Sequence, residues 1–233
     1  MSIAENIKLI NQQIRDSERA SSRPENSVTL VGATKMNDAA RVQEAIAAGL
    51  SVCGENRVQE MLEKNAQGAY EGAHLHFIGH LQKNKVKQVV GLAELIHSVD
   101  SRELMQTISD CAVKKGIRQD VLLEINIAAE ESKSGFSPEE ITDALTFAGQ
   151  LPGIFVRGLM AVPPICAAPE ENLPFFHQME QLFIDNGKKK YDNVSMDFLS
   201  MGMSGDYQAA ISCGANLVRL GTAIFGQRIY PNK

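Results

Sequence analysis

Short apolar runs alternate with amphipathic segments along almost the whole chain. The runs are rich in Val, Ile, Leu and Phe and are bounded by Gly, Ser and Asn, as in buried strands. After most of them, apolar residues recur three and four positions apart among charged residues, which predicts helices with one buried face. The expected strands are 27–34, 51–56, 74–79, 94–100, 119–126, 153–162, 196–202 and 216–226.

Capping residues mark where the intervening helices begin and end. Asp38, Ser101 and Ser137 stand at probable N-cap positions, and Glu140 follows Ser137 at the spacing of a capping box. Glycine is the expected residue at helix stops. Such glycines are Gly49, Gly91, Gly116, Gly149, Gly187 and Gly214.

The strict alternation of strands and helices predicts a parallel sheet with right-handed crossovers. Eight strand candidates in 233 residues fit a closed (β/α)8 TIM barrel. An open doubly wound sheet is the alternative, but no GxGxxG motif opens the first helix. Residues 1–20 place isoleucines at helical spacing, which predicts an additional N-terminal helix packed on the barrel. We expect one α/β domain over residues 1–233.

Composition removes several classes of function. The chain is 44% hydrophobic and 22% charged, with a formal net charge of −5 and no long basic run, so nucleic acid is not an expected partner. No apolar run approaches the roughly 18–20 residues of a membrane span. The N-terminus does not have the pattern of a signal peptide. We therefore expect a cytoplasmic protein that has no membrane partner.

Cysteine and histidine spacing gives no support for a disulfide framework or a metal centre. The four cysteines, which form no CxxC pair, are Cys53, Cys111, Cys166 and Cys213. His74, His76 and His80 are close in sequence, but a third and a fourth zinc ligand cannot be placed around them. The sequence predicts no metal.

Lys35 directly follows the first expected strand, where the active sites of parallel barrels lie. Val31, Ala33 and Lys35 share one face of that strand, because side chains alternate. If this face is the interior, the amine points into the barrel mouth, where burial lowers the pKa of an ammonium and favours attack on an aldehyde. By position alone, a solvated lysine at a strand end remains the alternative.

The last two expected strands supply an anion site beside that amine. Residues 200–206, SMGMSGD, form a turn of small residues before a helix, which offers backbone N–H groups and the Ser204 hydroxyl to a phosphate. Arg219 shares one face of the last expected strand with Leu217 and Gly221, and we expect this face to be interior. Gly221 and Thr222 make a second small corner. Turn geometry and a structural ion pair of Arg219 are the alternatives. Together with Lys35, this set describes a pyridoxal phosphate (PLP) site.

The chain also resembles a known family in its motifs. The segments GATKMND, CGENRVQE, HFIGHLQKNK, INIAAEESKSGF, GLMAVPP, LSMGMSGDYQAAI and VRLGTAIFG are similar to those of the pyridoxal phosphate homeostasis proteins. The resemblance runs from the first strand to the C-terminus, and HFIGHLQKNK together with LSMGMSGD is very specific. It implies an alanine-racemase-like barrel that binds PLP covalently.

The resemblance assigns roles to individual residues. It implies that Lys35 is the Schiff-base lysine and that Arg219 faces the pyridine nitrogen. Phosphate contacts are implied for Ser204, Gly221 and Thr222. Asn56 is implied to lie near the ring. His80 and Met203 complete the expected cofactor-binding set of Lys35, Asn56, His80, Met203, Ser204, Arg219, Gly221 and Thr222.

Two functions follow from a bound PLP. One is cofactor homeostasis by storage, buffering or delivery to PLP-dependent apoenzymes, and the alternative is a racemase-type enzyme of weak activity. Racemisation needs an acid or base on each face of the substrate carbon. Barrel racemases draw the opposing tyrosine from a second domain of a dimer partner, and we expect that domain to be absent here. We therefore expect no catalytic residues and a monomer.

Two further segments are expected at the barrel mouth without an assigned role. Residues 82–87, QKNKVK, follow the third strand and are either near the cofactor or a solvated helix start. Lys133 follows the fifth strand and is either a second, weaker contact for the aldehyde or phosphate, or part of an ordinary loop.

Overall fold

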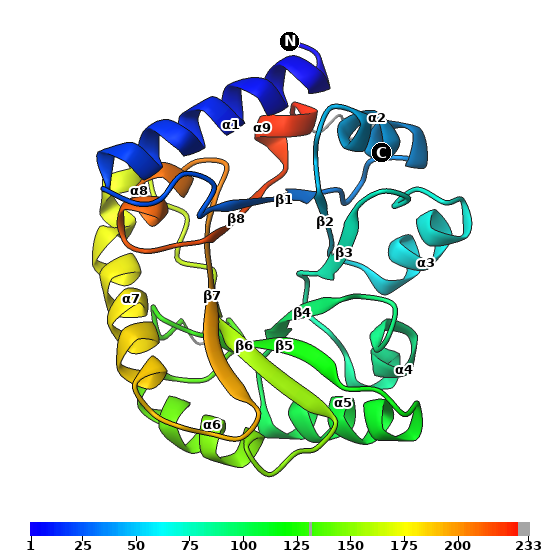
Figure 1. Cartoon of the computed structure of the whole chain (residues 1–233), viewed down its shortest axis with the longest axis vertical. Helices are drawn as coiled ribbons and strands as arrows, with labels where there is room; N and C mark the ends of the chain where they lie inside the picture. The colour runs from blue at the N-terminus through cyan, green and yellow to red at the C-terminus, as the bar shows by residue number, and fades with distance from the viewer. Residues whose placement is uncertain (131, 228–233) are drawn as a thin grey trace.

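Eight parallel strands form a closed ring in this computed structural model, which describes residues 1–130 and 132–227 (Figure 1). The strands are β1 Thr29–Ala33, β2 Val52–Glu55, β3 His74–Phe77, β4 Leu95–Val99, β5 Gln119–Ile125, β6 Ile154–Ala161, β7 Val194–Met203 and β8 Leu217–Leu220. Neighbours in sequence pair around the ring, and β1 pairs with β8 to close it. The predicted TIM barrel is confirmed, and the open sheet is excluded.

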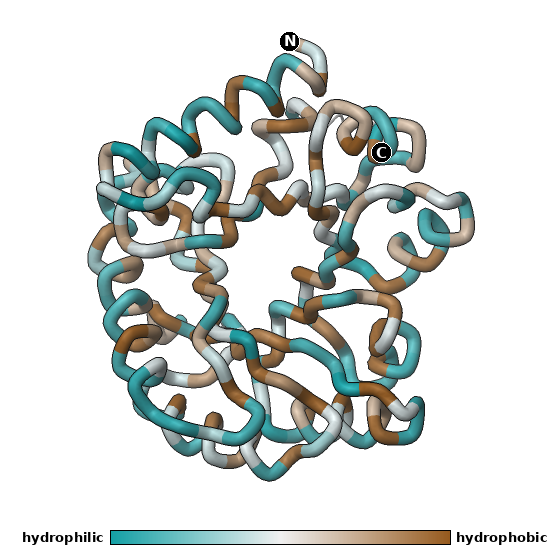
Figure 2. Tube along the Cα trace, in the orientation of Figure 1, coloured by the Kyte–Doolittle hydropathy of each residue, from teal (hydrophilic) through white to brown (hydrophobic). Residues whose placement is uncertain are grey.

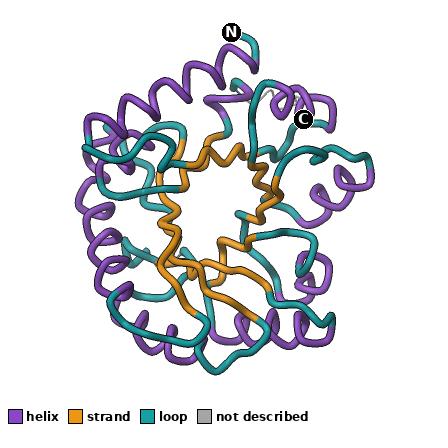
Figure 3. The backbone as a smooth tube through the Cα atoms, viewed as in Figure 1, coloured by secondary structure: helices purple, strands orange, loops and turns teal. Residues whose placement is uncertain are grey.

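Helices surround the strand ring on its outside (Figure 3). They are α1 Ile3–Ala20, α2 Ala39–Ala47, α3 Val58–Ala66, α4 Val86–Val89, α5 Arg102–Lys114, α6 Ile141–Ala148, α7 Leu173–Gly187, α8 Tyr207–Ser212 and α9 Thr222–Phe225. Short 3-10 helices are η1 Lys83–Lys85, η2 Pro138–Glu140 and η3 Pro169–Asn172. The additional N-terminal helix is α1, whose buried residues include Ile3, Ile7, Ile10 and Ile14. Figure 2 shows hydrophobic positions recurring among hydrophilic ones along this helix.

The predicted helix starts form as the sequence indicates. The Asp38 carboxylate accepts the N–H of Arg41 at 2.9 Å, and the Ser101 hydroxyl accepts the N–H of Leu104 at 3.4 Å. The expected strand 216–226 was too long, because β8 stops at Leu220 and residues 222–225 form α9. The apolar residues of that segment pack as one helical turn instead, with Ile224 fully buried.

Two separate apolar layers hold the barrel. The larger layer lies between strands and helices. The smaller layer fills the barrel interior with one residue from each of six strands: Val31, Val52, Leu95, Leu122, Met160 and Leu217. Because side chains alternate along a strand, Val31 inside places Ala33 on the interior face, and Leu217 inside does the same for Arg219. The expected interior faces of β1 and β8 are therefore confirmed.

A buried ion pair anchors the end of β1. Glu55 is fully buried and Lys64 is 5% exposed, and the Lys64 Nζ lies 2.8 Å from the Glu55 Oε1. The same carboxylate oxygen accepts the Thr34 hydroxyl at 2.6 Å and the Tyr70 hydroxyl at 3.0 Å. Lys64 also donates to the Thr34 carbonyl at 2.8 Å. Both the backbone and the side chain of the residue before Lys35 are thereby fixed.

The residue after Lys35 is tied to the same cluster. Met36 has a φ of 60°, which is unusual for a side chain of this size, and its N–H donates to the Glu60 carboxylate. That carboxylate also accepts Lys64 at 2.7 Å. The turn carrying Lys35 is therefore held on both sides by one lysine of α3.

Replacing Lys64 by Met should lower the free energy of unfolding by about 3–5 kcal/mol, because the Glu55 carboxylate is left buried without a counter-charge. Urea titration followed by far-UV circular dichroism measures the change. Lys188→Met is the matched control, since Lys188 and Asp185 pair on the surface with side chains 68% and 51% exposed. The control should change stability by less than about 1 kcal/mol. Equal midpoints for Lys64→Met and the parent would show that the pair does not support β1.

Candidate functional site

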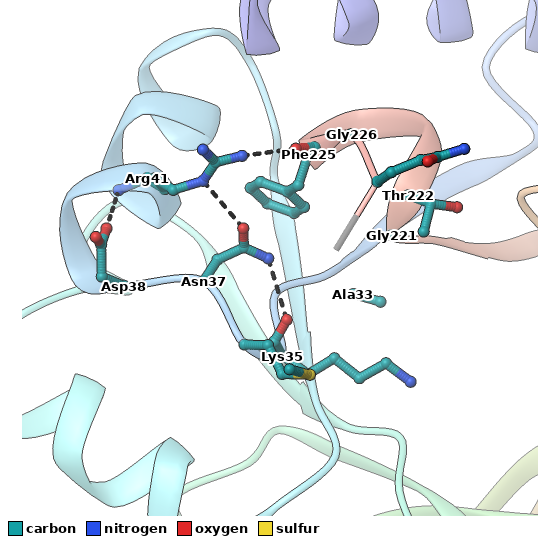
Figure 4. Close-up of a pocket in the computed structure, with 11 residues that line it drawn as sticks. Ala33, Lys35, Asn37, Asp38, Arg41, Gly221, Thr222, Phe225 and Gly226 are labelled. Atoms are coloured by element: carbon teal, nitrogen blue, oxygen red, sulfur yellow. Dashed lines mark hydrogen bonds between the residues drawn. The ribbon is translucent and has the colours of Figure 1, made fainter. Parts of the chain in front are cut away.

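Lys35 lies at the carboxyl end of β1, one residue beyond Thr34, with a half-buried side chain. It lines a cavity of about 390 Å³ with Ala33 from the same strand and with Gly221 and Thr222 from the end of β8. Figure 4 shows the side chain running beneath Ala33 toward the side of the cavity that carries Gly221 and Thr222. The structure thus brings three of the predicted site residues to one cavity.

The opposite wall of this cavity is built by the start of α2. Asn37 donates to the Lys35 carbonyl at 3.1 Å, and its own side-chain oxygen accepts the Arg41 guanidinium at 3.0 Å (Figure 4). Arg41 also donates to the Phe225 carbonyl at 2.6 Å, which links α2 to α9. The contacts join the loop after β1 to the loop after β8, where the cavity lies.

Ser204 connects the turns that follow β7 and β8. Its hydroxyl accepts the backbone N–H groups of Gly221 and Ala223, each at 3.3 Å. The Asp206 carboxylate accepts the N–H of Met203 at 2.7 Å and the Asn172 amide at 2.8 Å, which fixes the first turn from its other side. Backbone donors of α9 therefore converge on a hydroxyl beside the Lys35 cavity.

Arg219 lies on the interior face of β8 and is only 6% exposed. Its Nη1 donates to the Ser200 carbonyl at 2.8 Å and also to the Ser200 hydroxyl, and its Nη2 donates to the Ala161 carbonyl at 2.8 Å. Burial lowers the pKa of Arg219 to about 10, while the charges of Glu124 and Asp206 act in the opposite direction. The hydrogen-bond partners of Arg219, which are Ser200 and Ala161, are neutral acceptors. Among the described residues, Arg219 forms no ion pair.

Asn56 and His80 lie at a second cavity, of about 310 Å³, together with Arg57, Gln82 and Lys85. The Asn56 Oδ1 is buried without a hydrogen-bond partner among the described residues. His80 has a side chain that is 60% exposed, and its Nδ1 lies 3.2 Å from the Asp100 carboxylate. Gln82 and Lys85 of the segment 82–87 therefore line the same cavity as Asn56.

Met203 lines a third cavity, of about 220 Å³, with Gly205 and Asp206. All eight predicted residues lie at or beside the carboxyl ends of the strands, which is one end of the barrel. Lys35, Gly221 and Thr222 share one cavity, and Asn56 and His80 share another. Arg219 is buried on the interior face of β8, where it is hydrogen-bonded to Ser200 and Ala161.

Lys133 is engaged in a loop contact. Its Nζ lies 2.6 Å from the Glu130 carboxylate and donates to the carbonyls of Val162 and Pro163 at 3.2 and 3.3 Å. The loop after β5 is thereby tied to the loop after β6. The geometry favours the ordinary-loop interpretation of Lys133, although residue 131 of this segment lies outside the described residues.

Sequence reasoning missed two polar residues inside the barrel. His97 and Ser200 are both fully buried, and the His97 Nδ1 lies 3.0 Å from the Ser200 hydroxyl. A signal was present in the sequence, since alternation from the interior residue Leu95 places His97 on the same face of β4.

Within residues 1–130 and 132–227, no group of three metal-ligating side chains is found, and no helix is long and apolar enough to cross a membrane.

Known proteins share both the sequence and the architecture of this chain. The profile of the alanine racemase N-terminal domain family matches residues 3–229. A relative from Aquifex aeolicus, named pyridoxal phosphate homeostasis protein, is 40% identical over 230 residues, covering 99% of this chain and 100% of the relative.

Solved structures extend this comparison. PipY of Synechococcus elongatus, solved with PLP bound, has a TM-score of 0.82 and 31% identity, covering 97% of this chain and 100% of that one. An alanine racemase of Clostridium difficile shares the fold with a TM-score of 0.67 and 16% identity, over 98% of this chain and 58% of the racemase. The chain therefore belongs to the alanine racemase N-terminal domain family and, within it, to the pyridoxal phosphate homeostasis proteins.

Proposed function

We propose that this protein binds PLP through a Schiff base on Lys35 and acts in the homeostasis of that cofactor by storage, buffering or delivery. The observation that carries the proposal is the shared cavity of Lys35, Gly221 and Thr222, beside backbone donors that converge on Ser204. When bound, PLP supplies an aldehyde that a lysine amine can attack. The name of the Aquifex aeolicus relative and the PLP-bound structure of PipY support the parts of the proposal that concern PLP binding and homeostasis.

The residues present fit the phosphate of PLP. The bonds from the N–H groups of Gly221 and Ala223 to the Ser204 hydroxyl are long, at 3.3 Å, so these donors can turn to a phosphate oxygen at little cost. Position 221 carries no side chain, and a Cβ there would lie 3.4 Å from the Cβ of Ala33, on the wall of the cavity. Glycine at this position therefore leaves room for a ligand.

The other end of the cofactor also finds fitting groups. The Asn56 Oδ1 is a buried acceptor that lacks a partner among the described residues, and burial of such an atom is costly unless a donor reaches it. Arg219 offers a cation that cannot accept a proton. Beside a pyridine nitrogen, this charge disfavours protonation of the ring and weakens its capacity to stabilise a carbanion.

We propose retention of the cofactor in preference to turnover. The Tyr70 hydroxyl is bound to Glu55, and the Tyr207 hydroxyl is bound to Gln13 at 2.6 Å. Tyr191 precedes β7, at the end of the barrel away from the mouth, and Tyr230 lies outside the described residues. In the described part of the chain, no tyrosine thus stands at the mouth as a second acid or base. Weak racemase-type activity is the alternative.

The biological setting belongs to the same proposal. Residues 1–233 act as one cofactor-binding domain, monomeric and cytoplasmic, that exchanges PLP with PLP-dependent apoenzymes. Met36 and Ile165, which are 50% and 97% exposed, lie in the loops after β1 and β6 and leave apolar surface at the mouth for brief contacts.

Lys35→Ala should abolish covalent binding of PLP. The parent protein, mixed with PLP, should show the visible absorption band of a protonated Schiff base, and borohydride should fix the label to one peptide containing Lys35. Lys35→Ala should lose the band and bind at least about tenfold more weakly, because the covalent bond is absent. Lys133→Met is the control at the same mouth and should keep both band and label. A label on Lys133, or an unchanged Lys35→Ala spectrum, would refute the assignment.

Amino acids incubated with the PLP-loaded protein in deuterated water should not exchange their α-hydrogen faster than with free PLP. The expected cause is the lack of a second acid or base at the mouth. Proton NMR of L- and D-alanine measures the exchange, and chiral chromatography measures racemisation. An exchange rate well above that of free PLP, lost in Lys35→Ala, would establish the enzyme alternative.

A further inference from the structure

A row of four hydrogen-bonded polar side chains, His76, His97, Ser200 and Arg219, crosses the apolar interior of the barrel; we call it the file. The His76 Nδ1 lies 3.0 Å from the His97 Nε2, and the His97 Nδ1 lies 3.0 Å from the Ser200 hydroxyl. That hydroxyl in turn accepts the Nη1 of Arg219. The four residues come from β3, β4, β7 and β8, and each is 9% exposed or less. The file runs from a cavity that His76 lines with Leu95 and Leu217 to the region beneath the Lys35 cavity.

Arg219 fixes the direction of every bond in this file. A guanidinium can only donate, so the Ser200 oxygen must accept from it. The Ser200 hydroxyl hydrogen then needs an acceptor, and in the described residues the His97 Nδ1 is the one within hydrogen-bond distance. His97 must therefore carry its proton on Nε2 and donate it to the His76 Nδ1. His76 in turn carries its proton on Nε2.

The charge state of the two imidazoles agrees with this direction. Burial, and then the neighbouring His74, lowers the pKa of His76 to about 4. Burial lowers the pKa of His97 well below its ordinary value, and His76 and Arg219 add to the effect. Both rings are therefore neutral near pH 7, so each offers one donor and one acceptor.

We propose that His97 is a positioning residue for the cofactor site: acting through the Ser200 hydroxyl, it orients the guanidinium of Arg219 in the barrel mouth. The proposal rests on the proposed function for its effect on PLP. Without an acceptor at His97, the Ser200 hydroxyl can rotate, and the lone pair directed at Arg219 is no longer fixed. His76 acts one step further back, by holding His97 in the tautomer that accepts from Ser200.

The first test uses the cofactor-free protein, so its outcome does not depend on PLP binding. Protein labelled with ¹⁵N at histidine and arginine is studied by ¹⁵N NMR at pH 7.5, with the histidine resonances assigned through His76→Gln and His97→Asn. Both rings should be neutral Nε2–H tautomers, and the Arg219 Nη protons should be resolved in the parent. Ser200→Ala should average the Arg219 Nη protons. A His97 Nδ1–H tautomer, or resolved Nη protons in Ser200→Ala, would overturn the proposal.

The second test measures PLP affinity and the visible spectrum of the bound cofactor. Ser200→Ala and His97→Leu should weaken binding by about 5- to 12-fold, as expected for about 1–1.5 kcal/mol from one lost hydrogen bond, and shift the band. His97→Asn keeps an acceptor facing Ser200 and should stay within about 3-fold of the parent. His74→Gln is the control, because His74 is exposed and pairs with Glu94 on the rim.

These variants distinguish a positioning role of His97 from a role in packing the barrel interior. If His97→Leu does not fold, Ser200→Ala alone decides, since it removes one oxygen and retains the carbonyl that Arg219 also uses. Parent affinity and spectrum in Ser200→Ala would refute the proposal, as would equal losses in His97→Asn and His97→Leu. A parent protein that binds no PLP would refute the proposed function, whereas the NMR result would still stand.

Discussion

The permanent charge of Arg219 is the constraint around which the barrel mouth is organised. Even with its pKa lowered to about 10 by burial, the guanidinium is charged near pH 7, so burial demands acceptors for its donors. The barrel supplies them from neighbouring strands, through the carbonyls of Ala161 at the end of β6 and Ser200 on β7. In register, Arg219 lies beside Val31 of β1 and Met203 of β7. One buried cation on β8 is thus hydrogen-bonded to β6 and β7, so it joins three strands at the mouth.

Neutral acceptors leave the charge of Arg219 uncompensated in its immediate contacts. Glu124 and Asp206 act on it from farther away, and burial raises the pKa of Glu124 to about 7, with Asp100 adding to that rise. A carboxylate bonded directly to the guanidinium would have cancelled most of its field. Among the described residues, Arg219 thus donates to neutral oxygens of Ser200 and Ala161, and under the proposed function its charge attracts a phosphorylated ligand and disfavours protonation of the pyridine ring.

The alternation of side chains along each strand, together with the order of strands and helices, predicted much of this fold and part of the site. Alternation placed Val31, Ala33, Leu217 and Arg219 on interior faces, and the structure agrees because successive side chains of a pleated strand point to opposite faces. The partners of buried charges could not be predicted in this way. Glu55 and Lys64 meet only after α3 folds back on β2, and His97 meets Ser200 across 103 residues of chain.

The local sequence pattern also gave a wrong strand boundary, where an apolar strand pattern and a glycine turn signal overlap. Residues 216–226 read as one strand because their apolar content is continuous, yet the chain turns at Gly221 into α9. The turn follows from tertiary contacts, since the N–H groups of Gly221 and Ala223 find the Ser204 hydroxyl and a continued strand would not present them together. The division of the mouth into several cavities depends likewise on loop contacts that have no local sequence signature.

The supports around the mouth differ in rigidity, and that difference bears on cofactor exchange. On one side, Thr34 and Met36 hold the Lys35 turn through a buried ion pair with bonds of 2.6–2.8 Å. From the interior, Arg219 is held by bonds of 2.8 Å to two carbonyls. The turns after β7 and β8 are joined to each other through bonds of 3.3 Å from one serine hydroxyl. Under the proposed function, the longer bonds between these two turns are the ones that an entering phosphate replaces, while the Lys35 turn and Arg219 keep their own hydrogen bonds.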